Sequence, residues 1–219
     1  MMAAQTRQPD QWLICSGGRA HPALPRAIMM PLLAPPPPGP VNLVENLLHG
    51  LDFASGDVIV FIEDDDWLHP HHIECLVKQF EASPSIVAAG DDLQRYYNLP
   101  HRLYRTFDNV GASLCQTAIS RSIVPVFKAV AEGCAKRGSF GIDTTFWREI
   151  MGAYEVSLVR TKTVVGLKGL PGQPGLGIGH RPKGQGWLPD PTGHVLAEWI
   201  GDEDAKRYME LVGQKGSDR

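Results

Sequence analysis

Residues 58–67 read VIVFIEDDDW, in which five apolar residues precede four acidic residues and a tryptophan. The apolar run is rich in β-branched side chains, which predicts a strand buried on both faces, as in a parallel sheet. The turn residues Ser55, Gly56 and Asp57 come directly before it. Four acids at the end of a buried strand are costly unless positive charge lies beside them. In open α/β sheets, this end of a strand is where ligands bind.

A hard divalent cation that carries a phosphate would satisfy these carboxylates, because Mg²⁺ and Mn²⁺ prefer carboxylates together with substrate oxygens. The alternative is a solvated acidic turn that caps a helix beginning near Pro70.

Composition predicts one soluble globular domain over residues 1–219, with 43% hydrophobic and 21% charged residues. The net charge of -3 argues against a protein that is basic all over. The four cysteines show no CxxC spacing, so they indicate neither a disulfide framework nor a zinc knuckle. Neither a signal peptide nor a long apolar run is visible, which predicts a cytoplasmic protein without a membrane segment.

The rest of the chain alternates between helical and strand patterns, which is typical of an α/β fold. The proline-rich residues 19–40 are expected to form an extended loop outside the sheet. Helices are expected at 41–53, 70–80, 122–137 and 143–151, and a helical tail at 191–212 with a break at Gly201. Strands are expected at 11–15, 85–90, 94–98, 102–107, 112–119, 157–160 and 163–165.

Residues 166–186 hold eight glycines and are expected to form a mobile loop. Residues 156–189 contain five cations and no acid. A flexible basic segment suits a lid that closes over an anionic ligand, and a solvated loop is the alternative.

Three stretches resemble glycosyltransferases of family 2 with the GT-A fold: residues 5–18 (QTRQPDQWLICSGG), 42–67, and 141–148 (GIDTTFWR). The last is similar to the family pattern EDxxLxxR, with Ile142 in place of the glutamate. The resemblance implies a Rossmann-like, mixed but mostly parallel sheet flanked by helices. It also implies a metal-dependent enzyme that uses a nucleotide-sugar donor such as UDP-glucose.

The resemblance also implies roles for individual residues. Asp64 and Asp66 would bind Mn²⁺ or Mg²⁺, and Asp64 and Asp65 would contact the donor. Asp143 would be the general base of an inverting transfer, or an N-cap aspartate. On the 166–186 loop, His180 would be a third metal ligand or a surface histidine, and Lys168, Arg181 and Lys183 would bind phosphate oxygens. The run His69-Pro70-His71-His72 suggests a zinc cluster less than a helix cap.

Two departures from the family pattern concern the donor site. The strand and helix that precede the QT element are missing, so the chain is expected to be truncated or completed by a partner's strand. Cys15-Ser16 stands where the family has an acidic pair that contacts the nucleoside.

The chain is also similar to compact phage-type enzymes that glycosylate 5-hydroxymethyl pyrimidines in DNA. Arginines and tyrosines interleave over residues 94–105, which suits contact with phosphates and bases. A cross-strand ladder covering the sheet is the alternative. A saccharide or small-molecule acceptor, a non-catalytic GT-A-like domain, and a nucleotidyltransferase also stay open.

Overall fold

The computed structural model describes residues 1–16, 27–31, 40–108, 110–171, 182 and 186–213. Within these residues the strands form three sheets. A two-stranded parallel sheet pairs β1 (Trp12–Ser16) with β2 (Ala27–Pro31). A four-stranded sheet has the order β3 (Val58–Val60), β8 (Thr117–Ser120), β5 (Ala88–Gly90), β9 (Val156–Leu158). A five-stranded sheet has the order β11 (Leu188–Pro189), β7 (Leu103–Asp108), β6 (Leu93–Asn98), β10 (Val164–Lys168), β4 (Asp66–Leu68).

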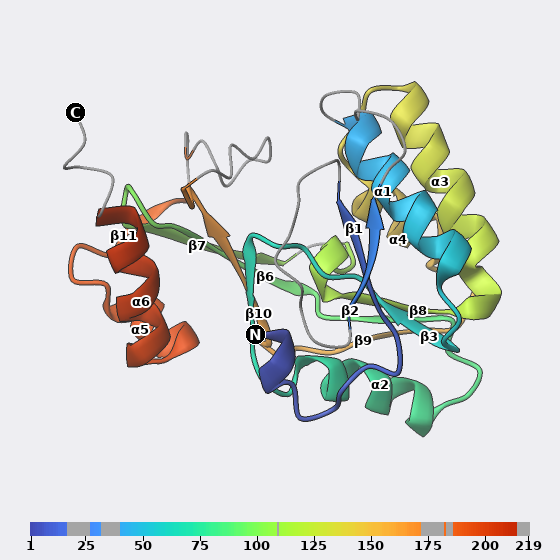
Figure 1. The fold of residues 1–219 in the computed structure, drawn as a ribbon, viewed down its shortest axis with the longest axis horizontal. Coiled ribbons are helices and arrows are strands. Elements are labelled where there is room, and N and C mark those ends of the chain that lie inside the picture. Colours follow the sequence, from blue (N-terminus) through green and yellow to red (C-terminus); the bar gives the residue numbers. More distant parts are fainter. Residues whose placement is uncertain (17–26, 32–39, 109, 172–181, 183–185, 214–219) are drawn as a thin grey trace.

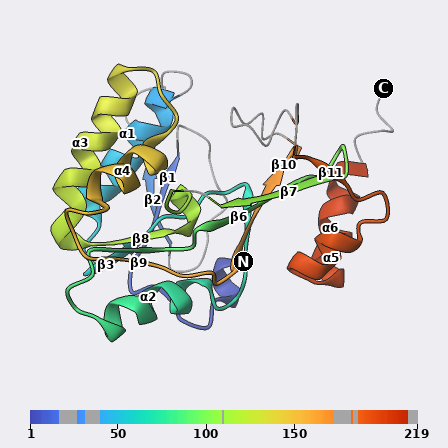
Figure 2. The same cartoon turned by 180° about the vertical axis from the view of Figure 1, so that it is seen from behind.

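Helices cover both faces of the four-stranded sheet (Figures 1 and 2). On one face lie α1 (Pro40–Phe53), α3 (Val124–Lys136) and α4 (Ile142–Ile150), and on the other lies α2 (His72–Ala82). The five-stranded sheet extends away from this body to α5 (His194–Ile200) and α6 (Asp202–Gly213). Short 3-10 helices occur at η1 (Met2–Ala4), η2 (Leu114–Gln116) and η3 (Arg121–Ile123). No helix among the described residues is long and apolar enough to cross a membrane.

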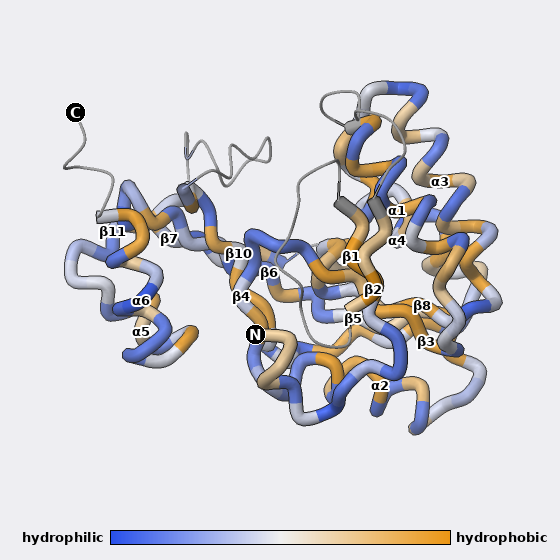
Figure 3. The backbone as a smooth tube through the Cα atoms, in the orientation of Figure 1, coloured by the Kyte–Doolittle hydropathy of each residue, from blue (hydrophilic) through white to orange (hydrophobic). Residues whose placement is uncertain are grey.

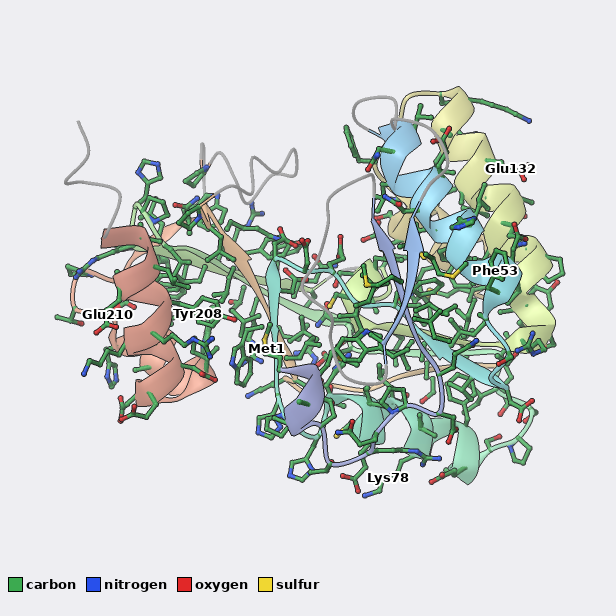
Figure 4. All side chains as sticks on the ribbon, viewed as in Figure 1. Met1, Phe53, Lys78, Glu132, Tyr208 and Glu210 are labelled. Carbon is green, nitrogen blue, oxygen red and sulfur yellow. The ribbon has the colours of Figure 1, made fainter. Side chains whose placement is uncertain are left out.

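Two larger hydrophobic cores and a small cluster of Leu68, Cys115 and Val164 stabilise the described residues, and the two larger cores follow the apolar residues of strands and inward helix faces (Figure 3). In the larger core, Phe61 stacks on Phe127 of α3 with 4.5 Å between ring centroids. In the smaller core, Leu196 and Ile200 of α5 pack against strands β4, β6 and β10. Met1 lies between the two parts (Figure 4), where its sulfur accepts hydrogen bonds from the Leu68 N–H and the Tyr208 hydroxyl.

The expected mixed α/β fold with sheets flanked by helices is confirmed, and it is consistent with a GT-A fold. The pairing is less parallel than expected, because antiparallel pairs outnumber parallel pairs among the described strands. The hairpin of β6 and β7 appears as predicted, and the break between α5 and α6 falls at Gly201, whose φ of 85° suits glycine.

Residues 58–67 do not form the single doubly buried strand that the apolar run predicts. β3 ends at Val60, its residues are half-buried, and β8 is its one partner among the described strands. A turn at Asp64 and Asp65 then redirects the chain, and Asp66 begins β4 in another sheet. Consecutive acids favour such a solvated turn over a continued strand.

Two further expectations about loops are wrong. Ala27–Pro31 is a strand, because its one proline is the last residue and the residues before it keep N–H donors that can pair with β1. Likewise, Gly166–Lys168 belongs to β10, every residue of which is buried, although the sequence places these residues in the glycine-rich loop. The helix expected from Pro70 begins two residues later, at His72.

Candidate active site

The acidic turn lies where the two larger sheets meet. Phe61 is fixed in the larger core, and Trp67 in the smaller one, so residues 62–66 are held at both ends. Asp64 is exposed, Asp65 is half-buried, and Asp66 is only 4% exposed. The turn therefore presents carboxylates at three different depths.

Lys168 binds this turn from the neighbouring strand. β10 runs antiparallel to β4 with Gly166 opposite Asp66, so Lys168, two residues further, lies on the same face of the sheet as Asp66. Its Nζ lies 2.9 Å from Oδ2 of Asp65 and 3.0 Å from Oδ1 of Asp66. The Lys168 side chain is 11% exposed, so the two ion pairs are largely shielded from water.

Tyr96 of β6 completes the wall on the other side of Lys168. The Nζ of Lys168 lies 5.5 Å from the centre of the Tyr96 ring, within the range of a cation–π contact. The ring crosses directly over Gly166, where a Cβ would lie 2.4 Å from Cδ1 of Tyr96. Glycine at 166 is therefore needed for this ring to reach the lysine.

The charges of this cluster perturb one another. Burial alone lowers the pKa of Lys168, but the attraction of Asp66, Asp65 and Glu63 outweighs burial and raises it, so the ammonium is retained. Burial raises the pKa of Asp66, and Lys168 offsets part of that rise. Burial, followed by repulsion from Asp66, raises the pKa of Glu63 to about 8. The ammonium of Lys168 thus does not fully offset the burial and mutual repulsion of these carboxyl groups.

Cys115 links the turn to η2. Its thiol lies close enough to the Asp66 carboxylate to lower the pKa of Asp66 slightly. Burial raises the pKa of this thiol well above its usual value, followed by repulsion from Asp66 and Glu63. Cys115 is therefore a neutral, buried thiol beside the Asp66 carboxylate.

Asp143 approaches the cluster from the first turn of α4. Gly141 is the N-cap, so the prediction that Asp143 caps the helix is wrong. Its Oδ1 accepts a 2.7 Å hydrogen bond from the Thr144 N–H instead. Burial raises the pKa of Asp143, and the hydrogen bond from the Thr144 N–H offsets part of the rise. The charge of Asp143 in turn raises the pKa of Glu63 and of Tyr96.

Trp147, four residues after Asp143, lies on the same side of α4 and fixes the helix. Its indole N–H donates to Thr117 Oγ1 at 3.1 Å. Its ring fills a slot beside Gly90 and Gly111, where added Cβ atoms would lie 2.9 Å and 2.3 Å from ring carbons. Ile142, which replaces the acid of the family pattern, is 1% exposed in the larger core.

The donor set fits a hard divalent cation, but the described side chains are not already gathered around one. Glu63, Asp65 and Asp66 all act on the single ammonium of Lys168, so negative charge is in excess. Within the described part of the chain, no group of three or more His, Cys, Asp or Glu side chains could hold a metal ion as it stands. The ammonium of Lys168 pairs with two of these carboxylates, those of Asp65 and Asp66.

The structure therefore brings together Asp65, Asp66 and Lys168 directly and Asp143 electrostatically, with Asp64 exposed on the same turn. His180, Arg181 and Lys183 lie outside the described residues. Glu63, Tyr96 and Cys115 also belong to this site, although the sequence gives Glu63 and Cys115 no role and places Tyr96 in the arginine- and tyrosine-rich hairpin. Glu63 carries a signal as the first acid of the run.

The histidines of residues 69–72 have separate partners. His72 is buried and its Nδ1 lies 2.8 Å from Thr163 Oγ1, whereas His71 pairs with Glu74 at the surface. The N-terminal QT element holds this segment, since Gln5 bonds the His69 carbonyl and the Ile73 N–H.

Most of the arginine- and tyrosine-rich hairpin makes internal contacts. Arg95 is 7% exposed and donates to the Val164 carbonyl, and the Tyr97 hydroxyl donates to Asp190. Arg105 lies 4.9 Å from the Phe107 ring centre and is half-buried. At the hairpin tip, His101 and Arg102 are exposed. The cross-strand ladder thus accounts for much of the pattern.

A hollow between β4 and the C-terminal helices is separate from the acidic cluster. Trp67, Trp199, Glu198 and Asp204 line it, and the Trp67 indole N–H donates to Asp204 at 2.7 Å. Because successive strand residues face opposite sides, Trp67 and Asp66 point away from each other.

Comparison with known proteins gives one family match. Residues 38–121 match the model of Glycosyl transferase family 2, which indicates a family 2-like glycosyltransferase. The matched range includes α1, the acidic turn, Lys168's partners Asp65 and Asp66, and Cys115, but not residues 5–18 or 141–148. No curated protein matches the chain.

Proposed function

We propose that this glycosyltransferase moves a hexose from UDP-glucose to a hydroxyl group with inversion, using Mn²⁺ or Mg²⁺. The arrangement that supports this proposal most is the acidic turn with Lys168 bound to Asp65 and Asp66, and with Asp143 near enough for its charge to act on Glu63. It combines groups that suit a metal-bound diphosphate with a carboxylate that suits a proton acceptor.

Asp64 and Asp66 would hold the divalent cation, which when bound neutralises the diphosphate leaving group. Lys168 would stabilise the same developing charge. Asp143 would take the proton of the acceptor hydroxyl, and its raised pKa makes it a better base than an ordinary aspartate. The acceptor oxygen forms a bond to C1 of the sugar, the bond from C1 to phosphate breaks, and UDP leaves with the electron pair.

Metal-dependent turnover of UDP-glucose tests this proposal. We expect Asp66→Asn to reduce Mn²⁺-dependent hydrolysis or transfer by about a hundredfold or more, because a charge that stabilises the transition state is lost. Asp10→Asn, which removes an exposed acid of the N-terminal segment, should retain parental activity. No metal-dependent turnover in the parent protein, or full turnover in Asp66→Asn, would contradict the proposal. A metal-dependent thermal shift without turnover would favour a non-catalytic domain.

We further propose that the acceptor is a 5-hydroxymethyl pyrimidine in DNA. Exposed His101 and Arg102 at the hairpin tip, with Arg105 over Phe107, supply groups that suit phosphate contact. The target nucleotide would have to leave the base stack to reach Asp143. Labelled hexose should then enter hydroxymethylated DNA and not unmodified DNA. Transfer to a saccharide or small molecule alone would replace this acceptor.

A further inference from the structure

Lys168 forms an ion pair with Asp66, one of the two carboxylates proposed to bind the metal. It contacts Asp66, the deepest acid of the turn, at 3.0 Å and Asp65 at 2.9 Å. A divalent cation on Asp66 would be close to this ammonium, and like charges at short range repel strongly where water is largely excluded.

Resting on the proposed function, we propose that Lys168 is a built-in counter-cation that holds Asp65 and Asp66 in the metal-free protein. When metal and donor bind, its ammonium moves from the carboxylates to the donor's phosphate oxygens. Lys168 is thus a positioning residue for Asp65 and Asp66 and a ligand for the donor.

The shape of the site supports this role. Lys168 is the last residue of β10, so its backbone is fixed while its four-carbon side chain can swing. Gly169 follows with a φ of 83°, and a Cβ there would lie 2.5 Å from Cδ of Pro100. The chain therefore turns immediately after the lysine, and the side chain needs no strand movement to change partners.

The same geometry explains why an ammonium ion beside the acidic turn stabilises the fold. Without a cation, the largely shielded carboxylates of Asp65 and Asp66 would carry uncompensated charge, which is costly. The ammonium reduces that cost and keeps Asp66 facing the site. It also makes metal binding weak until phosphate oxygens offer the lysine another anion.

Mn²⁺ titration without nucleotide tests the proposal, with free Mn²⁺ followed by electron paramagnetic resonance. We expect Lys168→Met, which removes the charge but keeps most of the side-chain length, to bind Mn²⁺ at least about tenfold more tightly than the parent. Lys168→Gln should behave in the same way while retaining an N–H donor toward Asp66. Lys168→Arg, the charge-retaining control, should not bind Mn²⁺ more tightly.

UDP binding in saturating Mn²⁺, measured by calorimetry, should change in the opposite direction. Both neutral variants should bind UDP about tenfold more weakly, because a phosphate ligand is lost. A lysine that only supports the fold would weaken both ligands together. Tighter Mn²⁺ binding in neither neutral variant, or undiminished UDP binding in both, would overturn the proposal.

Thermal unfolding covers the case in which neutral variants are unstable. Mn²⁺ should raise their Tm more than that of the parent, because the metal replaces the lost cation. Failure of Mn²⁺ to restore them would also overturn the proposal. Since the Mn²⁺ titration needs no donor, it can succeed even if the parent fails to turn over UDP-glucose, and that failure would contradict only the proposed function.

Discussion

At the residue scale, Asp143 is the side chain whose proposed role is most directly testable. We expect Asp143→Asn to lower the transfer rate by roughly 10²–10⁴-fold, because an amide cannot accept the acceptor's proton. Its amide oxygen can still accept the Thr144 N–H, so α4 should keep its position. Donor binding should change by no more than about twofold. Transfer kinetics and UDP-glucose calorimetry measure the two effects.

Glu149→Gln provides a matched control for this prediction. Glu149 is an exposed acid on the same helix, so its neutralisation should leave the transfer rate unchanged. Full transfer by Asp143→Asn would show that another group accepts the proton.

Individual residues also show what the sequence could and could not predict. The acids of the turn and Asp143 stand out because their local patterns are unusual. The roles of Cys115 and Tyr96 depend on residues far away in the chain. Cys115 lies beside Asp66, and Tyr96 contacts Lys168. No local pattern distinguishes such a cysteine or tyrosine from an ordinary core residue.

At the element scale, periodicity predicted most helices well because each helix buries one stripe of its own residues. Strand pairing was harder, because partners are set by distant segments. The apolar run at 58–62 does not indicate that the last of the acids after it, Asp66, begins a strand in another sheet. The glycines of residues 166–186 predict a loop where part of β10 lies. Gly166 is glycine because the Tyr96 ring crosses over it, and not because the chain turns there. The sequence therefore places Lys168 in a loop, whereas it is the last residue of β10.

The burial of His72, where α2 contacts the segment before β10, should make the free energy of unfolding depend on pH. Burial lowers the pKa of His72 from 6.5 to about 4, and its Nδ1 contacts Thr163. Between these values the unfolded chain binds the proton and the folded chain does not, so stability falls as pH falls from 6.5 toward 4. The full effect is about 3 kcal/mol.

Urea unfolding at several pH values can measure this contribution. His72→Asn keeps a polar group near Thr163 but cannot titrate, so its stability should fall less between pH 6.5 and 4. The difference between the two proteins removes the contribution of carboxylates that titrate in both. Equal pH dependence would show that His72 does not supply the effect.

At the scale of the whole molecule, the candidate site lies between two cores. α3 and α4 stabilise the side that carries Asp143, whereas α5 and α6 stabilise the reverse face of β4 and β10. Alternation along β4 sends Asp66 to the site and Trp67 to the smaller core. Packing of the C-terminal helices should therefore stabilise β4 and β10, the strands that carry Asp66 and Lys168.

Leu196→Ala tests this dependence. Leu196 is fully buried in the smaller core, so its truncation should cost about 2–5 kcal/mol of unfolding free energy. Hydrogen exchange should increase first at Val165 and Leu167 of β10, while amides of α3 remain protected, because α3 packs in the other core. Leu211→Ala on α6, where the leucine is 42% exposed, should change stability by no more than about 0.5 kcal/mol. An equal rise in exchange across α3 and β10 would show that the two cores unfold as one unit.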